Sequence, residues 1–461
     1  MNAALGVATR LRRHRGVALL HSARQDNGCG RWSFVACEPV RSIEAHGRVI
    51  SLYDRSGMVR ERFDGDPLEV LQELVQEHTR RWSDDIAGPV PVAIGYIGYD
   101  LARVLQPFEA GSARVADDEP DMWFGLYDSV WRFDEHSRRS DIVGKSAGAR
   151  RSLAEAIARG DDSTGRAPAF DPLLGQGAHS SSNADDERTE YVQRVERALS
   201  HIRTGEVQHL DLTRRLVAEI RENGDPMALY AALMRTDPAP YSAFLSTQLG
   251  EQSNPSFILS ASPVRFLTRE PKGELIESRP FAGMRPRTGD AERDREIAAE
   301  MAADPKGRAL LQAIVDATSG GLGQIASPGT VTADEMSVQE RPHEYHLASR
   351  VAGELQPNIT FPQIIRTMLP WAASAGVPLV RALELIDALE PTRRRLHHGT
   401  IGYLGLGGAM DLAFSTKTAL LSQGQLTVNV SDCITADTDA AASLAETERQ
   451  ANAWRKMWNL A

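Results

Sequence analysis

The chain has 461 residues, of which 42 % are hydrophobic and 25 % charged, and its formal net charge at pH 7 is −10. This composition is typical of a globular protein, and the length is sufficient for one large core or two ordinary domains. The acidic balance argues against a nucleic-acid partner, because phosphate binding needs a basic face.

Neither a membrane span nor a secretory leader is expected. No apolar run approaches the roughly 18–20 residues that cross a bilayer. The arginines within residues 10–15 precede an apolar run that is too short for a signal peptide and lacks a small-residue cleavage site. Cys29, Cys37 and Cys433 form no CxxC pair, so neither a disulfide framework nor a zinc site is expected. These features favour a cytoplasmic protein without a membrane partner.

Residues 1–157 are expected to form a strand-rich region. Apolar runs separated by turn residues predict strands at Val17–Leu20, Trp32–Ala36, Val92–Ile97 and Met122–Val130. One helix is predicted over Pro67–Arg80, where apolar residues recur at helical spacing. Residues 158–187 are polar, small and aperiodic, which is typical of a flexible linker.

Residues 188–461 are expected to form a second region that packs with the first as one unit. Helices are predicted over 189–203, 293–318, 378–388 and 440–460, with strands over 216–220, 242–245, 257–260, 265–268, 275–279, 400–406, 412–421 and 425–430. Two sheets with helices packed outside, an α+β arrangement, fit this order better than a repeating βαβ pattern.

Short motifs occur in a fixed order along the chain. They include Leu19-Leu-His-Ser, Arg31-Trp-Ser-Phe, Gly95-Tyr-Ile-Gly-Tyr-Asp100, Arg279-Pro-Phe-Ala-Gly-Met-Arg285, His346-Leu-Ala-Ser349, Gly399-Thr-Ile-Gly-Tyr403, Thr435-Ala-Asp437 and Glu446-Thr447. From residue 17 to the C-terminus, this collinear order resembles the chorismate-utilising enzymes, above all component I of aminodeoxychorismate synthase and also that of anthranilate synthase. The resemblance implies two packed antiparallel sheets surrounded by helices, and a lyase or transferase reaction on a small molecule.

The resemblance also implies partners and a second site. The chain has no glutaminase nucleophile motif, so glutamine-dependent chemistry would need a separate glutaminase subunit. In relatives the N-terminal sheet carries an amino-acid pocket, and Ser22 and Trp32 fall where it is expected. The alternative is that Ser22 and Trp32 merely belong to strands.

The family holds Mg²⁺ on glutamates, because a hard cation prefers oxygen ligands. The matching positions here are Gly307, Leu310 and Ser443, and only Glu446 is retained. No cofactor is therefore expected. The loops that hold the ring carboxylate have also changed, since Leu379 replaces a lysine and Asp432 replaces a glycine.

Other family positions are kept. By resemblance, His346 is the catalytic acid–base group and Glu446 a second catalytic residue. Tyr403 and Lys417 match the tyrosine and arginine that hold the pyruvyl carboxylate, and lysine keeps the charge without the bidentate fork. The substrate-binding set is Tyr403, Lys417, Arg285, Gly283 and Gly402.

Three hypotheses remain open from the sequence. The first is a conventional synthase component that aminates chorismate. The second is a diverged, Mg²⁺-independent enzyme of specialised metabolism that acts on a related, less anionic molecule with His346 as its acid–base group. The third is a catalytically silent subunit that binds a ligand or a partner.

Overall fold

The computed structural model describes residues 3–25, 29–80, 82–83, 86–106, 119–160, 184–219, 225–247, 256–341 and 343–458. Most of the predicted linker lies outside these residues. The helix before it ends at Arg159 and the helix after it begins at Ala184, so the last residues assigned to the linker are helical.

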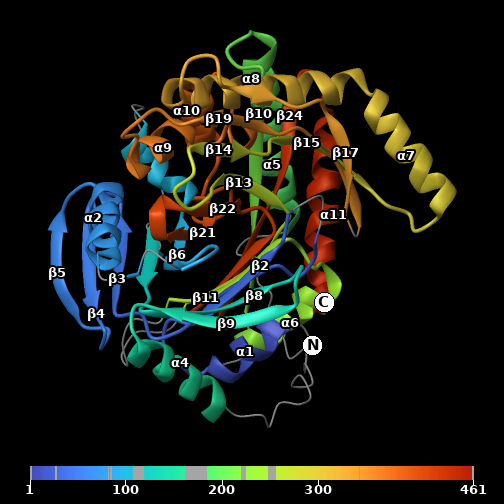
Figure 1. Cartoon of the computed structure of the whole chain (residues 1–461). Coiled ribbons are helices and arrows are strands. Elements are labelled where there is room, and N and C mark those ends of the chain that lie inside the picture. Colours follow the sequence, from blue (N-terminus) through green and yellow to red (C-terminus); the bar gives the residue numbers. More distant parts are fainter. Residues whose placement is uncertain are drawn as a thin grey trace.

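Among the described residues, two large antiparallel sheets form the centre of the molecule (Figure 1). The ten-stranded sheet has the order β20 (Gly376–Val377), β10 (His209–Glu219), β24 (Gln425–Thr435), β23 (Thr418–Ser422), β12 (Phe257–Ser262), β11 (Tyr241–Ser246), β1 (Ala18–His21), β2 (Trp32–Ala36), β8 (Ser129–Asp134) and β9 (Arg139–Gly144). The eleven-stranded sheet has the order β16 (Thr332–Ala333), β19 (Val351–Glu354), β14 (Leu275–Ser278), β13 (Val264–Arg269), β22 (Met410–Phe414), β21 (Thr400–Gly405), β6 (Pro91–Ile97), β7 (Met122–Leu126), β3 (Arg41–His46), β4 (Val49–Asp54) and β5 (Val59–Asp64). The predicted α+β fold of two packed antiparallel sheets is confirmed.

Strands from both sides of the linker share each sheet. In the ten-stranded sheet β1 pairs with β11, and in the other sheet β6 pairs with β21. Apolar side chains of these four strands, such as Ala18, Leu245, Ile94 and Ile401, belong to one core between the two sheets. The two regions expected from the sequence therefore form one intertwined unit.

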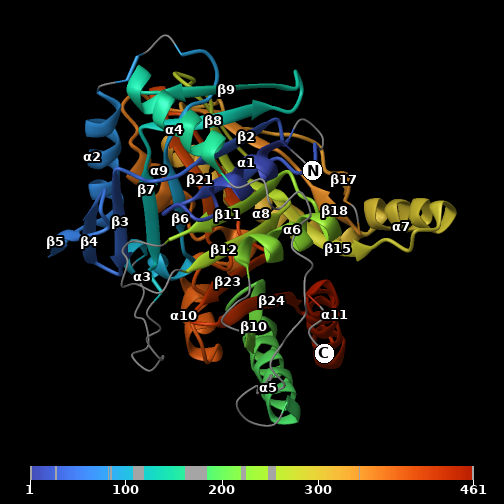
Figure 2. The ribbon, with the colours of Figure 1, turned by 90° about the horizontal axis from the view of Figure 1, so that it is seen from below.

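Helices cover the outer faces of the sheets. They are α1 (Ala3–Leu11), α2 (Pro67–Thr79), α3 (Ala102–Leu105), α4 (Ala147–Arg159), α5 (Ala184–Arg203), α6 (Pro226–Thr236), α7 (Ala291–Ala303), α8 (Pro305–Ile325), α9 (Phe361–Met368), α10 (Leu379–Leu389) and α11 (Ala440–Trp458). α1, α4 and α6 pack on the ten-stranded sheet, and α2, α8 and α9 on the eleven-stranded sheet (Figure 1). α7 projects from the body in both ribbon views (Figure 2). Among the described residues, no helix is long and apolar enough to cross a membrane.

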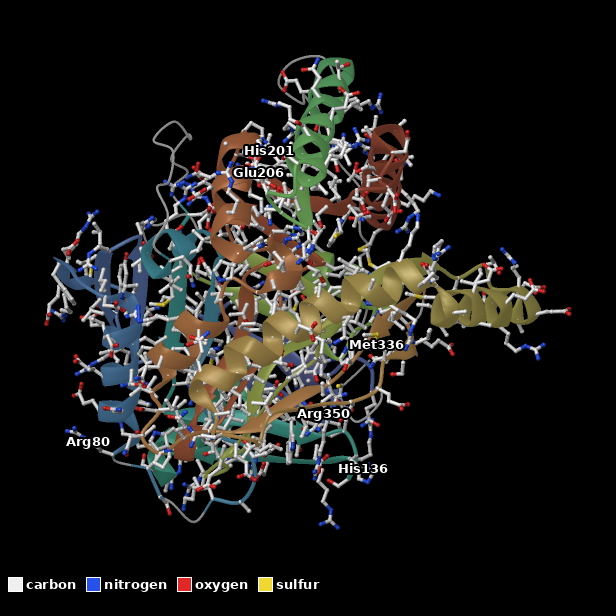
Figure 3. The ribbon with its side chains drawn as sticks, turned by 90° about the horizontal axis from the view of Figure 1, so that it is seen from above. Arg80, His136, His201, Glu206, Met336 and Arg350 are labelled. Carbon is white, nitrogen blue, oxygen red and sulfur yellow. The ribbon has the colours of Figure 1, made fainter. Side chains whose placement is uncertain are left out.

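α5 and α10 flank the long β10–β24 pair and share a core with it. His201 at the end of α5 lies beside Glu206, with Nδ1 2.9 Å from Oε1 (Figure 3). Glu206 also accepts a hydrogen bond of 2.6 Å from Nη2 of Arg381 on α10. This polar contact fixes the end of α5 against α10.

Four local predictions need correction. The strand expected over Met122–Val130 is two strands, β7 in the eleven-stranded sheet and β8 in the ten-stranded sheet. The helix expected over 293–318 is two helices, because Asp304 is extended, caps α8 through the Lys306 N–H and precedes Pro305. The strand expected over 412–421 is divided between β22 and β23. The N-terminal region also contains α1 and α4, which were not expected.

Candidate active site

His346 lies in a small third sheet, made among the described residues by β15 (Phe281–Pro286), β18 (Glu344–Ala348) and β17 (Ser337–Glu340). Its side chain is buried, and its ring stacks on Phe281 with the centroids 5.4 Å apart. The Phe281 ring also lies near the rings of Trp371 and Phe414, with centroid distances of 6.4 and 6.2 Å. His346 therefore lies against an aromatic wall.

A chain of charged groups leads away from His346. The same Glu344 oxygen, Oε1, lies 2.9 Å from His346 Nε2 and 2.7 Å from Lys417 Nζ. Lys417 Nζ also donates to Asp237 Oδ2 at 2.9 Å. Two carboxylates of the protein thus neutralise the lysine that was expected to hold a substrate carboxylate.

The surroundings hold this chain in its charged form. Burial alone would raise the Glu344 pKa, but Lys417 and the hydrogen bond with His346 place it well below its usual value. Burial alone would lower the Lys417 pKa, but Glu344 and Asp237 raise it above its usual value. An ionised Glu344 and a protonated Lys417 are the stable states near neutral pH.

Gly283 lies in a β-bulge opposite His346. The β15–β18 register shifts between Ala282 and Met284, and Met284 pairs with His346. Gly283 has φ 66°, a left-handed conformation that glycine adopts without steric cost. Gly283 therefore shapes the backbone next to His346. Arg285, further along β15, is half exposed, and its Nη2 lies 3.4 Å from Asp304 Oδ2.

The four positions expected to hold metal in relatives carry little ligand chemistry here. Gly307 has no side chain, and Leu310 packs against the core around α8. Ser443 is buried with its Oγ 3.0 Å from Tyr191 Oη. Glu446 receives two hydrogen bonds from Arg449, of 2.8 and 2.6 Å. Among the described residues, no group of three or more His, Cys, Asp or Glu side chains could hold a metal ion.

Asp432 adds a carboxyl group to the same side of the molecule. Burial and the nearby Glu446 raise its pKa to about 6, although a hydrogen bond with Ser443 opposes the shift. Leu379 begins α10 and packs into the core that α10 shares with α5. The Leu379 side chain and an ionised Asp432 carboxylate cannot donate a hydrogen bond to a ring carboxylate.

The structure does not bring Tyr403 and Gly402 to His346. Side chains alternate between the two faces of a strand. In β22, which pairs with β21, Asp411 lines a pocket on one face while Phe414 joins the aromatic wall on the other. Tyr403 is directly opposite Asp411 and lines the same pocket, so it faces away from the aromatic wall. Gly402 permits close pairing, because a Cβ there would lie 2.0 Å from the Asp411 carbonyl oxygen.

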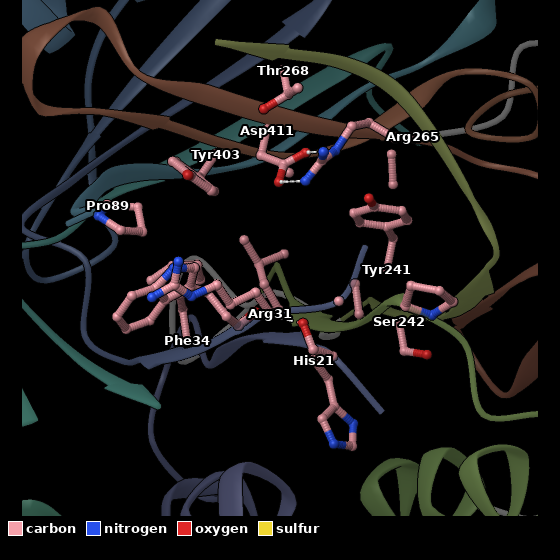
Figure 4. Close-up of a pocket in the computed structure, with 18 of the residues that line it drawn as sticks. His21, Arg31, Phe34, Pro89, Tyr241, Ser242, Arg265, Thr268, Tyr403 and Asp411 are labelled. Carbon is pink, nitrogen blue, oxygen red and sulfur yellow. Dashed lines mark hydrogen bonds and ion pairs between the residues drawn. The ribbon is translucent and has the colours of Figure 1, made fainter. Parts of the chain in front are cut away.

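The pocket that contains Tyr403 lies between the two large sheets and has a volume of ≈ 370 Å³. Ser22 and Trp32 belong to its walls as well as to the strand region. Arg265 binds Asp411 through two hydrogen bonds of 3.0 and 2.9 Å, while the ring of His21 points away from this pair and lies 3.1 Å from Tyr230 Oη (Figure 4). The polar groups of this wall are therefore largely paired with one another.

Several residues around His346 were not predicted from the sequence. Glu344 could have been found, because it is two residues before His346 on a strand and period-two alternation places both on one face. Asp237 gave no signal, since it is distant in sequence from Lys417. His397 and His398 were also missed; their rings stack 3.9 Å apart, and His398 stacks on Phe414 at 5.3 Å.

Comparison with known proteins supports the family suggested by these features. The family model described as chorismate binding enzyme matches residues 21–456. The chain is 31 % identical to anthranilate synthase component 1 of Streptomyces coelicolor, over 94 % of this chain and 82 % of that protein. It is 32 % identical to aminodeoxychorismate synthase component 1 of Klebsiella aerogenes, over 94 % and 92 %.

Solved structures share the fold. Anthranilate synthase component I from Streptococcus pneumoniae superposes with a TM-score of 0.73 at 24 % identity, covering 93 % of this chain and 92 % of that chain. The menaquinone-specific isochorismate synthase from Escherichia coli gives 0.70 at 16 % identity, covering 99 % and 91 %. Because the family model matches nearly the whole chain, the chain belongs to the chorismate-binding enzyme family.

Proposed function

We propose that this chain is a diverged chorismate-family enzyme that acts, without Mg²⁺, on a ring substrate less anionic than chorismate. His346 is its acid–base group, and its setting is specialised metabolism. The observation that carries the proposal is the state of Lys417, whose charge is taken up by Glu344 at 2.7 Å and Asp237 at 2.9 Å. A cation already paired with two carboxylates has little attraction left for a third.

The opposite side of the site supports the same proposal. Chorismate carries a ring carboxylate, and an ionised Asp432 would repel it. Gly307 and Leu310 provide no oxygen ligands, and Glu446 is engaged by Arg449. A divalent cation needs several oxygen ligands, which this set does not offer.

Direct assay separates this proposal from the conventional one. The purified chain is incubated with chorismate, ammonium and Mg²⁺, with and without EDTA, and chorismate loss is followed. We expect no EDTA-sensitive turnover. Turnover that EDTA abolishes would overturn the proposal and favour a synthase component that receives ammonia from a glutaminase subunit, as the name "component 1" of the relatives suggests.

Affinity for chorismate tests the role of Lys417 itself. The double variant E344Q/D237N removes both negative charges from Lys417 and should bind chorismate more tightly than the natural chain in isothermal titration calorimetry. E340Q is the matched control, because Glu340 is exposed and pairs with Arg287. Equal affinity of all three proteins would contradict the proposal.

A ligand-responsive subunit is the second candidate function. The pocket between the sheets favours this candidate. A cavity of ≈ 370 Å³ lined by Ser22, Trp32 and Tyr403 is present, although the family's metal ligands are not. Thermal unfolding with each of the common amino acids tests it. A concentration-dependent rise in the midpoint, absent in a variant that fills the pocket such as A243F, would support this candidate.

A further inference from the structure

Glu344 and His346 form a buried pair whose geometry is set by one short strand. They are separated by one residue in β18, so both side chains leave the same face. The two side chains are 7 % and 2 % exposed, and Nε2 lies 2.9 Å from Oε1. Little water can compete for this hydrogen bond, so the partner of Nε2 is fixed by the fold.

The charge state of Glu344 decides which ring nitrogen carries the proton. An ionised carboxylate only accepts hydrogen bonds, so the nitrogen facing it must be the protonated one. Lys417 and Asp237 hold Glu344 in that state from the other side, with contacts of 2.7 and 2.9 Å. A neutral His346 therefore carries its hydrogen on Nε2 and leaves Nδ1 as an acceptor.

Further charged groups lie around the pair. Glu344 from β18 and Asp237 from the end of α6 contribute two negative charges. Lys417 contributes one positive charge, and Arg449 from α11, whose pKa is raised by Glu446 and more weakly by Glu344, contributes another. With Glu446, which pairs with Arg449, the cluster holds three carboxylates and two cations, and Glu344 accepts the hydrogen of His346 Nε2 within it.

The second ring nitrogen of His346 differs from Nε2 in its contacts. Nδ1 of His346 is buried and has no hydrogen-bond partner within the described part of the chain. Buried polar atoms are almost always paired, so an unpaired one at a site points to a ligand or water contact. An acceptor there suits a hydroxyl, an amine or an acidic C–H, whereas a carboxylate has no hydrogen to offer.

We propose that Glu344 is a positioning residue that presents His346 Nδ1 as a proton acceptor to a ligand bearing a hydrogen-bond donor. In the reaction, the proton moves from the ligand to Nδ1 and the electron pair of the broken bond stays on the ligand. The negative charge of Glu344 stabilises the imidazolium that results. The inference rests on the proposed role of His346 and adds the direction of proton transfer and the ligand chemistry.

Tautomer measurement tests this without any substrate. The full chain is labelled with ¹⁵N in its histidine rings, and long-range ¹H–¹⁵N correlations are recorded near neutral pH, with the variant H346N used to assign the signals. We expect the neutral form of His346 to carry its hydrogen on Nε2. A hydrogen on Nδ1 alone, or a doubly protonated ring, would overturn the inference.

Two variants show whether Glu344 is the cause. In E344Q the amide can donate as well as accept, so the His346 signals should shift to a mixture of tautomers. E340Q, which changes an exposed carboxylate on neighbouring β17, should leave them unchanged. Unchanged signals in a folded E344Q would overturn the inference, and if E344Q does not fold, the natural chain alone decides. Chorismate turnover with Mg²⁺ would instead overturn the proposed function and leave the tautomer result standing.

Discussion

The charged side chains on the two faces of the β21–β22 pair are paired in different ways. On the face with Tyr403, Arg265 and Asp411 neutralise each other and border an open pocket. On the face with Phe414, Lys417 is paired with Glu344 and Asp237 next to His346 and the aromatic wall. The Arg265–Asp411 pair borders a pocket that can hold a ligand. The positive charge of Lys417, in contrast, is neutralised by two carboxylates and attracts an anionic ligand only weakly.

The largest expected difference between the faces is in stability. K417M would leave Glu344 and Asp237 without their cation, and removing one partner of a buried ion pair costs about 3–5 kcal/mol. R265M should cost less, about 1–3 kcal/mol, because Asp411 borders the pocket and can be hydrated. Urea unfolding of both variants measures this order. Equal losses would show that the two ion clusters are alike in burial.

The second prediction concerns pH and the His346 face. The folded-state pKa of Glu344 is lowered, so its contribution is present above the unfolded value of about 4.3 and lost as pH falls through the folded value. E344Q should therefore be less stable than the natural chain by about 2 kcal/mol near neutral pH. The gap should narrow in acid. Denaturant titrations at several pH values measure it, and a gap that widens in acid would contradict the sign.

The third prediction restores the missing ligands on the same face. The triple variant G307E/L310E/S443E should bind Mn²⁺ at least about tenfold more tightly than the natural chain, a difference of about 1.4 kcal/mol. Water relaxation measurements with Mn²⁺ detect this directly. The single variant L310E is the control for adding a carboxylate to α8 alone, and equal binding by all three proteins would show that the helices do not bring these positions together.

The smallest effect is expected at Asp432. Its folded-state pKa is about 6, above the ordinary value, so ionising it in the folded protein costs free energy at higher pH. D432N should stabilise the chain by about 1 kcal/mol above pH 7, allowing for partial exposure, and should make little difference below about pH 4. Thermal unfolding at the two pH values tests the sign. A loss of stability in D432N above pH 7 would contradict the prediction and mean that the carboxylate is favourably paired.

Much of the fold could be predicted from the sequence. Strand periodicity and the collinear motifs led to the two sheets and to His346. They could not assign Tyr403 correctly, because a motif fixes a position along β21 but the face it occupies depends on register with β22. They could not reveal Asp237, which reaches Lys417 only through folding. α1 was missed because it is short and its apolar residues, such as Leu5 and Leu11, gain stability from packing on the sheet rather than from local propensity.

The intertwining of the sheets has a consequence for how the chain could be divided. β1 lies between β2 and β11, and β6 lies between β7 and β21, so each sheet needs strands from both sides of residues 161–183. Two polypeptides made by cutting there would each expose unpaired strand edges and an incomplete core. They should be insoluble when produced alone and should recover the fold when produced together, as complementing fragments of a single protein.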